Sequence, residues 1–477
     1  MVDVRHRSGH PFGEMLSKAD KQRLFSTLPK VDALLEADTL APLRKRLGDR
    51  ALTNLVRDAL QSIRREALET ATVPDRDAIV DRVARAASAV LGRRARRVIN
   101  ASGVVLHTNL GRAPLSEAAV QALAATSGGY TSVEIDLSTG RRGPRGAFME
   151  TALAQLTGAE AALVVNNCAA AVLLVLTSTA RGKGVVVSRG EQVEIGGSFR
   201  VPEVLERSGA RMIEVGTTNR TRVADYERAI DDNDDVAVLL RVHRSNFRQV
   251  GFVEEATIAE LAELANRRGV LLVHDLGGGA LVDPSDVGLA GEPVVEACVR
   301  DGAHLVCFSC DKLLGGPQGG AIVGSAELVG AVRRDPLARA LRLGRLPMVA
   351  LEATLQSYLA GELGAIPAQA AMRRPAGELA ERVGAWQRAL QARGVVAEVV
   401  ELGSQIGGGT LAEIPLPSWG LAISTSEPDE VARRLRLGDP AVLPRIQDDR
   451  LLVDGRTVLP GEEEPLVEAL ARALGSP

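Results

Sequence analysis

Lysine, aromatic side chains and long apolar runs are all scarce in this chain of 477 residues. Aromatic residues make up only 3% of the chain, so aliphatic side chains and alanine must fill its cores. No run of 18 apolar residues occurs, which excludes a membrane-spanning helix. The sequence begins M-V-D-V-R-H-R-S-G-H, without the apolar stretch of a signal peptide, so we expect no secretory signal. The four cysteines lie in apolar or glycine-rich surroundings, which indicates free thiols and a cytoplasmic location.

Because lysine is scarce, few residues are candidates for a reaction that needs a lysine amine. Only six of the 57 basic residues are lysine, namely Lys18, Lys21, Lys30, Lys45, Lys183 and Lys312. Five of them lie in basic helical segments or a turn. Lys312 alone follows an apolar run, 304–308, and precedes a glycine-rich turn, which suits a lysine that forms a Schiff base. Taken by itself, Lys312 fits a surface lysine after a strand equally well.

The formal charge of −3 argues against a nucleic-acid partner for the chain as a whole, but it hides an asymmetry. Residues 1–98 carry 20 Lys and Arg against 13 Asp and Glu, which gives +7, and the remainder carries 37 against 47, which gives −10. Apolar spacing predicts a helix in 51–68, and Asp75 is placed to cap a second one. This basic unit suits contacts with RNA phosphates, although a solvated helical face would carry the same charge.

After Val98 the pattern changes to short apolar runs that alternate with helical stretches. This alternation predicts a mostly parallel α/β sheet covered on both faces, with ligands bound beyond the carboxyl ends of its strands. A linker near 361–367 leads to a smaller α+β region. We therefore expect three domains, 1–98, 99–362 and 363–477. The predicted strands of the sheet are 162–166, 185–188, 212–215, 236–240, 270–273 and 304–308.

Two further features stand at the ends of these strands. Asp275 follows the run 270–273, where a carboxylate would keep the pyridine nitrogen of pyridoxal phosphate protonated. The alternative interpretation of Asp275 is a plain Asp–Gly turn. The strand 162–166 runs into a helix of small residues, whose N–H groups would bind a phosphate, and Ser309 could add a hydroxyl. An ordinary capped helix is the alternative there, but Lys312, Asp275 and this helix together fit one pyridoxal phosphate.

Other motifs give no competing chemistry. Cys307 and Cys310 have the spacing of a redox or zinc motif, but Cys307 lies within an apolar strand and no second pair completes a metal site. The sequence contains no Walker motif, and its six histidines show no H-E-x-x-H spacing. We therefore expect no metal.

Long stretches of the chain resemble the bacterial selenocysteine synthase family, the L-seryl-tRNA(Sec) selenium transferases. The likeness covers nearly the whole chain and implies the aspartate-aminotransferase-like fold, which is fold type I of the pyridoxal-phosphate enzymes. It implies a small N-terminal helical domain and a C-terminal α+β domain as well. The matching stretches are 28–32 (L-P-K-V-D), 98–115 (V-I-N-A-S-G-V-V-L-H-T-N-L-G-R-A-P-L), 188–199 (S-R-G-E-Q-V-E-I-G-G-S-F), 215–220 (V-G-T-T-N-R), 311–318 (D-K-L-L-G-G-P-Q) and 350–355 (A-L-E-A-T-L).

The resemblance also implies a role for each site residue. Lys312 would hold the cofactor as an aldimine, and Asp275 would pair with the pyridinium nitrogen. His243 and Asn246 would reach the ring hydroxyl, with loop packing as their alternative. Asn167, Cys168, Ala169 and Ser309 would surround the cofactor phosphate. Arg112, Arg339 and Arg342 would bind the phosphate-like selenium donor, although Arg339 and Arg342 also suit a solvated helix face. Three positions depart from the family pattern, namely Cys310 (usually Gly), His274 (usually Glu) and Gly278 (usually Ser).

The implied reaction converts L-seryl-tRNA(Sec) to L-selenocysteinyl-tRNA(Sec) through a dehydroalanyl-tRNA intermediate, with selenophosphate as the selenium donor. Residues 1–98 would bind the tRNA, and dimers would assemble into a homo-oligomeric ring such as a decamer. Two alternatives remain open. One is a pyridoxal-phosphate lyase acting on a small amino acid. The other is an RNA-binding protein with a vestigial enzyme fold, against which the intact Lys312 and Asp275 argue.

Overall fold

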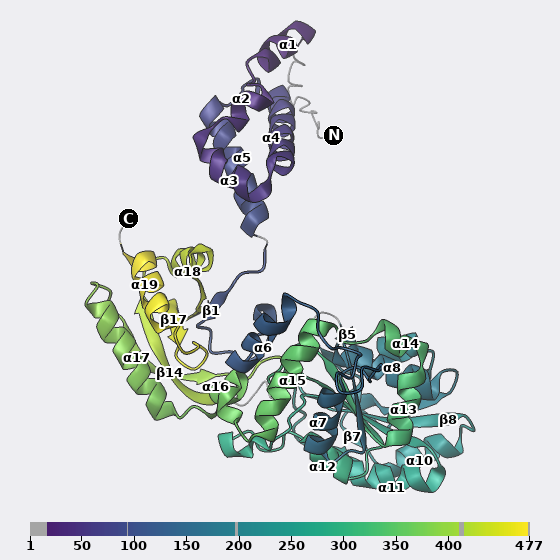
Figure 1. Cartoon of the computed structure of the whole chain (residues 1–477). Coiled ribbons are helices and arrows are strands. Elements are labelled where there is room, and N and C mark those ends of the chain that lie inside the picture. Colours follow the sequence, from purple (N-terminus) through teal and green to yellow (C-terminus); the bar gives the residue numbers. More distant parts are fainter. Residues whose placement is uncertain (1–16, 93, 196–198, 410–414, 476–477) are drawn as a thin grey trace, which may run out of the picture. The chain divides into compact units, whose positions relative to one another are not determined.

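The computed structural model describes residues 17–92, 94–195, 199–409 and 415–475. The chain divides into two compact units, Met1–Arg97 and Val98–Pro477, which are described separately (Figure 1). Among the described residues, no helix combines the length and the apolar character that a membrane crossing requires.

The first unit is helical, as its apolar periodicity predicts. The amphipathic helix α4 buries Leu52, Val56 and Ile63 in a core shared with α5. The predicted cap is confirmed, because the N–H of Ala78 donates to Asp75 Oδ1 at 2.8 Å. The elements of this unit are α1 (Lys18–Ser26), α2 (Val31–Leu35), η1 (Asp38–Leu40), α3 (Ala41–Leu47), α4 (Asp49–Thr70) and α5 (Arg76–Gly92).

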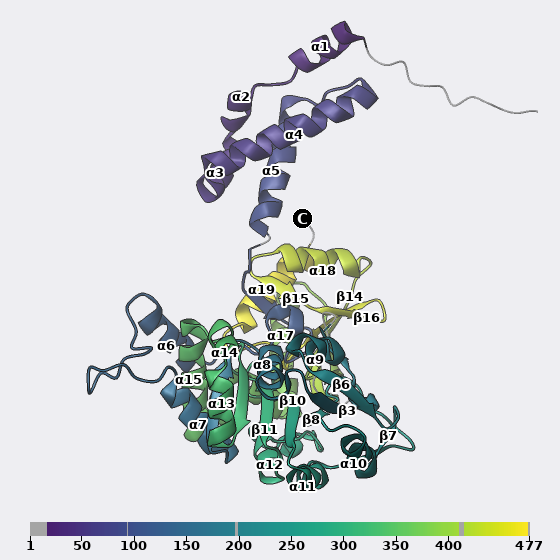
Figure 2. The ribbon, with the colours of Figure 1, turned by 90° about the vertical axis from the view of Figure 1, so that its right-hand side faces the viewer.

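The second unit is built around a seven-stranded sheet, and the predicted fold class is confirmed. All six predicted strands are present, and Figure 2 shows five of them side by side in the order β11, β10, β8, β3 and β6. The remaining strand, β12, was not predicted; it runs antiparallel between β11 and β2, with a glycine at each end. In sheet order the strands are β2 (Ala161–Val165), β12 (Gly320–Gly324), β11 (Leu305–Ser309), β10 (Leu271–Gly277), β8 (Val236–Val242), β3 (Gly184–Ser188) and β6 (Arg211–Val215).

Helices cover both faces of this sheet, because alternate strand residues point to opposite sides. Val273 and Cys307 pack on the face covered by α8, α9 and α13. Leu272 and Val306 pack on the opposite face. The first set of helices is α8 (Cys168–Ala180), α9 (Val201–Ser208) and α13 (Ala326–Arg334). The second set is α7 (Ala147–Thr157), α10 (Val223–Asp231), α11 (Ile258–Arg268), α12 (Val295–Arg300) and α15 (Arg345–Leu359).

The C-terminal part of this unit contains an antiparallel sheet in the order β13, β14, β17, β16. Its core includes Ile99 and Ala101, because β1 pairs in parallel with β15. The first residues of the unit therefore pack with its last part. The elements are β1 (Val98–Asn100), α17 (Ala376–Gln391), β13 (Glu398–Ser404), β14 (Leu416–Ser424), α18 (Pro428–Leu437), β15 (Ala441–Leu443), β16 (Arg445–Gln447), β17 (Arg450–Asp454) and α19 (Glu463–Leu474).

The linker expected at 361–367 is partly helical instead. A 3₁₀ turn, η5, precedes α16, and Pro367 occupies the first turn of that helix, where its missing N–H costs nothing. The remaining short elements are η2 (Thr108–Leu110), α6 (Glu117–Ser127), η3 (Arg189–Glu191), β4 (Glu194–Ile195), β5 (Phe199–Arg200), β7 (Arg220–Thr221), β9 (Glu254–Glu255), η4 (Pro284–Val287), α14 (Pro336–Ala340), η5 (Leu363–Ala365) and α16 (Pro367–Arg373).

Candidate active site

Lys312 lies in a tight turn directly after β11 and is 4% exposed. Several hydrogen bonds hold this turn. The N–H of Leu313 donates to the carbonyl of Gly278 at 3.1 Å, and the hydroxyl of Tyr358 donates to the carbonyl of Leu314 at 2.8 Å. The N–H of Gly315 closes the turn on the carbonyl of Lys312 at 2.9 Å. The amine is therefore buried on a segment that is fixed from two sides.

Asp275 lies on β10 and is 6% exposed. Strand alternation places it with Val273 on the face covered by α8, and Cys168 Sγ lies 3.6 Å from Asp275 Oδ1. Burial raises the pKa of Asp275 to about 6, against the opposing effects of the Lys312 charge, the Cys168 thiol and His243. Burial likewise raises the pKa of Cys168, with a further contribution from the Asp275 charge. Asp275, Lys312 and Cys168 therefore share one buried site.

The amino end of α8 forms a second part of this site. Asn167 caps the helix by accepting a hydrogen bond from the N–H of Ala170 at 2.9 Å. The N–H groups of Cys168 and Ala169 belong to the first turn, where a helix offers no internal acceptor. A Cβ on Gly320 would overlap the Asn167 carbonyl, so β12 approaches the helix as only glycine allows. Ser309 pairs with Gly320 in the sheet, which places the buried Ser309 near this helix end.

His243 follows β8 and sits beside Asp275. Its backbone N–H donates to the Asp275 carbonyl at 2.9 Å. Its ring nitrogen Nε2 lies 3.5 Å from Oε2 of Glu292, a residue in the loop before α12. Asn246 is further along the same segment, and its amide donates to the Glu194 carbonyl at 2.8 Å. The structure thus brings His243 to Asp275, whereas the contact described for Asn246 is with the β4 backbone.

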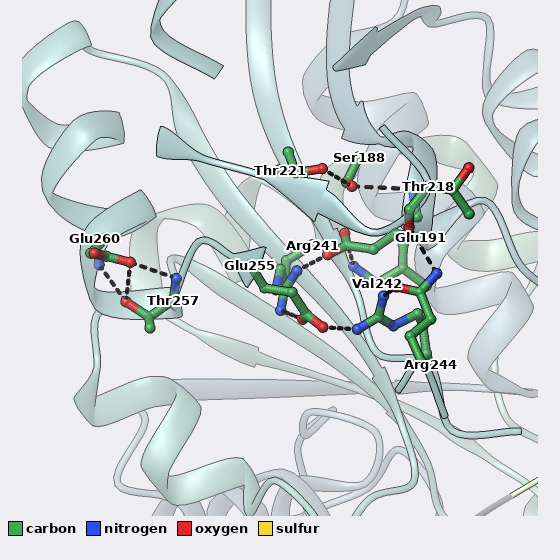
Figure 3. Close-up of polar contacts among 12 residues, drawn as sticks. Ser188, Glu191, Thr218, Thr221, Arg241, Val242, Arg244, Glu255, Thr257 and Glu260 are labelled. Carbon is green, nitrogen blue, oxygen red and sulfur yellow. Dashed lines mark hydrogen bonds and ion pairs between the residues drawn. The ribbon is translucent and has the colours of Figure 1, made fainter. Parts of the chain in front are cut away.

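A network of charged side chains around the buried Glu191 fixes the end of β8, as Figure 3 shows. The Glu191 side chain pairs with Arg241 and accepts the N–H of Val242 at 2.9 Å. Glu255 accepts from Arg241 at 2.6 Å and also pairs with Arg244. Burial lowers the pKa of Arg241 to about 10. Because these residues flank His243, the network determines where the segment after β8 leaves the sheet.

The three predicted arginines occupy different positions. Arg112 donates to Asp311 Oδ2 at 2.8 Å, one residue before Lys312, and it has a left-handed backbone with φ of 65°. Such a conformation is strained for a non-glycine residue and is typical of functional sites. The Arg342 side chain lies 3.4 Å from Glu134, while the carbonyl of Leu341 accepts the N–H of Asn166 at 2.9 Å.

Arg339 is exposed on α14. Within the described parts of the chain, neither Arg339 nor Arg342 forms a hydrogen bond or an ion pair with Lys312, Asp275 or Arg112. The structure therefore brings Arg112 to the lysine turn. It also brings the backbone of Leu341 and Arg342 to the end of β2, just before α8, because Arg342 forms a β-bridge with Val165.

Several residues of the site were missed by reasoning from the sequence. Asp311 was detectable as the neighbour of Lys312, but its partner Arg112 is 199 positions away. Glu292 lies in a loop without any motif. Of the departures from the family pattern, His274 is buried, and burial lowers its pKa to about 3, with the charges of Arg241 and His243 adding to the effect. Cys310 is a buried free thiol.

Comparison with known proteins gives two family matches. The family described as L-seryl-tRNA selenium transferase matches residues 98–459. The family described as selenocysteine synthase N terminal matches residues 25–64. Together the two matches extend over both compact units.

Curated relatives match along nearly their whole length. An L-seryl-tRNA(Sec) selenium transferase of Moorella thermoacetica is 45% identical, over 95% of this chain and 98% of the relative. Proteins of the same name from Hyphomonas neptunium and Aquifex aeolicus are 42% and 38% identical, each over 94% of this chain. Among solved structures, a D-glucosaminate-6-phosphate ammonia-lyase aligns with a TM-score of 0.56 and 22% identity, covering 81% of this chain and 97% of its own. This last likeness supports the fold.

Proposed function

The chain belongs to the L-seryl-tRNA selenium transferase family, and we propose that it converts L-seryl-tRNA(Sec) to L-selenocysteinyl-tRNA(Sec), with selenophosphate as selenium donor and pyridoxal phosphate as cofactor. The observation that carries this proposal is the buried Lys312 next to the buried Asp275, at the ends of neighbouring strands of the family's fold. The four free cysteines suit a cytoplasmic enzyme.

The residues present fit pyridoxal phosphate. A Schiff base needs a shielded amine, which the 4% exposed Lys312 provides. The pyridine nitrogen needs a carboxylate, which Asp275 provides at the end of β10. A phosphate suits the first turn of the 13-residue helix α8, next to Ser309. Gly277 lies beside the amine, because a Cβ there would be 3.8 Å from Lys312 Nζ, and its φ of 67° is a conformation that favours glycine.

Each of these residues has a distinct part in the reaction. Pyridoxal phosphate, when bound, supplies an electron sink for the bond that breaks at the seryl α-carbon. Lys312 would hold the cofactor through its amine, and the same amine is placed to take the α-proton. Asp275 holds a proton at the pyridine nitrogen, while the N–H groups of Cys168 and Ala169 bind the phosphate. The seryl hydroxyl then leaves the β-carbon as water, and selenium adds to that β-carbon. Cleavage of the P–Se bond of selenophosphate by water releases phosphate.

The selenium donor is an oxyanion, and we assign its binding to Arg112, Arg339 and Arg342. A guanidinium fork matches the geometry of a phosphate-like group. Arg112 supports this assignment best, because its ion pair with Asp311 places it at the lysine turn. In the same proposal, His243 and Asn246 lie toward the ring hydroxyl of the cofactor, and His243 is supported by its contact with the Asp275 backbone.

The basic first unit is the part that we propose binds tRNA. Arg50, Arg57 and Arg64 recur at intervals of seven along α4, so they form one exposed stripe with steps of about 10.5 Å. None of the three has an ion-pair partner among the residues described in this unit, which leaves them available for RNA phosphates. The proposal also includes assembly of dimers into a homo-oligomeric ring, which rests on the family resemblance alone.

Incubation with seryl-tRNA(Sec) and labelled selenophosphate tests the reaction directly. We expect the label to appear on the tRNA only when the enzyme, the cofactor and both substrates are present. Uncharged tRNA is the control, because it offers no seryl group. Consumption of free serine without labelled tRNA would instead show a lyase of a small amino acid, and no turnover of either would refute the proposed activity.

Neutralising the stripe on α4 should weaken tRNA binding. For the variant Arg50→Ala, Arg57→Ala, Arg64→Ala, we expect at least about a tenfold loss of affinity and a salt dependence reduced by up to about three phosphate contacts. Filter binding at several salt concentrations measures both quantities. Arg82→Ala is the matched control, because the Arg82 guanidinium is already paired with Glu66 at 2.6 Å. Equal binding by the wild type and the triple variant would place the RNA contacts elsewhere.

A further inference from the structure

The loop before α12 holds a carboxylate for which the proposed function has no role so far. The Glu292 side chain is completely inaccessible to solvent. Neither of its carboxylate oxygens has a hydrogen-bond partner among the residues that the structure describes. Burying a carboxylate without partners is expensive, and such groups are concentrated at functional sites. Glu292 is therefore a candidate for a role in the chemistry.

The surroundings of Glu292 connect it to the site. The N–H of Val295 donates to the Ala280 carbonyl at 3.0 Å, which holds the loop against the segment that follows β10. Gly278, in that segment, makes room for the carboxylate, because a Cβ there would overlap Glu292 Oε1. The carbonyl of Gly278 in turn accepts the N–H of Leu313, the residue after Lys312. The carboxylate thus lies next to the residues that fix the lysine turn.

Only one basic side chain in the described parts of the chain comes within 4 Å of this carboxylate. Nε2 of His243 lies 3.5 Å from Glu292 Oε2, and the backbone of His243 is bonded to that of Asp275. When a carboxylate binds one nitrogen of an imidazole, it sets the orientation of the ring and the protonation of the other nitrogen. Distances of this size often shorten when the substrate complex forms.

We propose that Glu292 is a positioning residue that holds the imidazole of His243 through Nε2. The ring is then fixed beside Asp275 and Lys312, with Nδ1 left to face the cofactor or the seryl group. This inference rests on the proposed function, since that function makes His243 part of the site. It adds a residue that acts through His243 and does not itself touch the reacting atoms.

The test uses the full-length holoenzyme and four variants, namely Glu292→Gln, Glu292→Asp, His243→Gln and the Glu292→Gln, His243→Gln double variant. We expect Glu292→Gln to lower kcat by about 10- to 100-fold with little change in KM for seryl-tRNA(Sec), as for other partners that orient a functional histidine. Glu292→Asp should recover part of the loss. In the His243→Gln background, the change at Glu292 should have no further effect. The exposed Glu296, on α12, provides the matched control Glu296→Gln.

A second variant moves the carboxylate without removing it. Gly278→Ala displaces Glu292 Oε1, so it should lower kcat in the wild-type background and have little effect beside His243→Gln. This variant keeps the charge of Glu292. If its loss of kcat agrees with that of Glu292→Gln, misfolding is excluded as the cause of that loss. Additive losses from Glu292→Gln and His243→Gln, or wild-type kinetics for Glu292→Gln, would overturn the proposal.

The absorbance band of the bound cofactor, recorded without tRNA, separates the two proposals. Glu292→Gln should shift this band, and the double variant should show the band of His243→Gln alone. A shift of this kind in a protein that never transfers selenium would refute the proposed reaction and retain the role of Glu292. Selenium transfer with an unshifted band and additive kinetics would refute the role of Glu292 and retain the proposed reaction.

Discussion

Replacing Lys312 with alanine is expected to abolish turnover, with a fall in kcat of at least about 1,000-fold. The variant loses both the amine that binds the cofactor and the base for the α-proton, and proton transfer by a placed side chain alone accounts for about 100- to 10,000-fold in enzymes. The near-visible absorbance of the Schiff-base cofactor should disappear at the same time. Selenium transfer to tRNA and an absorbance spectrum of the purified protein measure the two effects.

The matched control is Lys183→Ala. Lys183 is an exposed lysine in the turn before β3, so its loss should change neither the spectrum nor kcat. Retention of the cofactor band in Lys312→Ala would show that another group binds the cofactor. With only six lysines in the chain, each of the remaining five can then be tested in turn.

Asp275→Asn is expected to lower the activity of the enzyme and to raise the stability of the cofactor-free protein. An asparagine cannot hold a proton at the pyridine nitrogen of the cofactor, so kcat should fall by at least about 100-fold, within the usual range for a lost acid–base group. The cofactor-free protein, by contrast, should become more stable at neutral pH. Burial raises the pKa of Asp275 to about 6 from its ordinary value of 3.8, so ionising this carboxyl opposes folding.

The pH dependence of this stability follows from linkage. Below pH 3.8 the carboxyl is protonated in both the folded and the unfolded state, and it costs nothing. The cost grows between pH 3.8 and about 6 and is fully present above that value, where a shift of about two units corresponds to about 3 kcal/mol.

Urea unfolding of the cofactor-free wild type and of Asp275→Asn at pH 5, 6, 7 and 8 measures the difference. The stability gain of the variant should rise with pH and level off above about pH 6 to 7. A gain that is independent of pH, or a variant that is less stable at pH 8, would show that Asp275 is not held in the raised-pKa environment that its burial creates.

The outline of the fold could be predicted from the sequence, and so could the placement of Lys312 and Asp275 at the ends of neighbouring strands. Apolar runs such as 236–240 and 270–273 are local patterns, so each strand is encoded where it occurs. Lys312 and Asp275 stood out because each follows such a run, and the ends of neighbouring parallel strands meet at one edge of a sheet. Helix α5 could be predicted together with its cap at Asp75, because capping depends on residues that are close in sequence.

Only the tertiary structure decided how the rest of the site is assembled. Arg112 meets Asp311 across 199 positions, and Glu292 meets His243 and Gly278 through a loop that has no periodicity of its own. The core of the C-terminal part likewise includes Ile99, which comes from the start of the second unit. These contacts form between segments whose separate sequences carry no mutual signal, because the packing of the whole unit brings them together. The sequence therefore determined which groups we propose for the chemistry, and the tertiary structure determined which groups hold them in place.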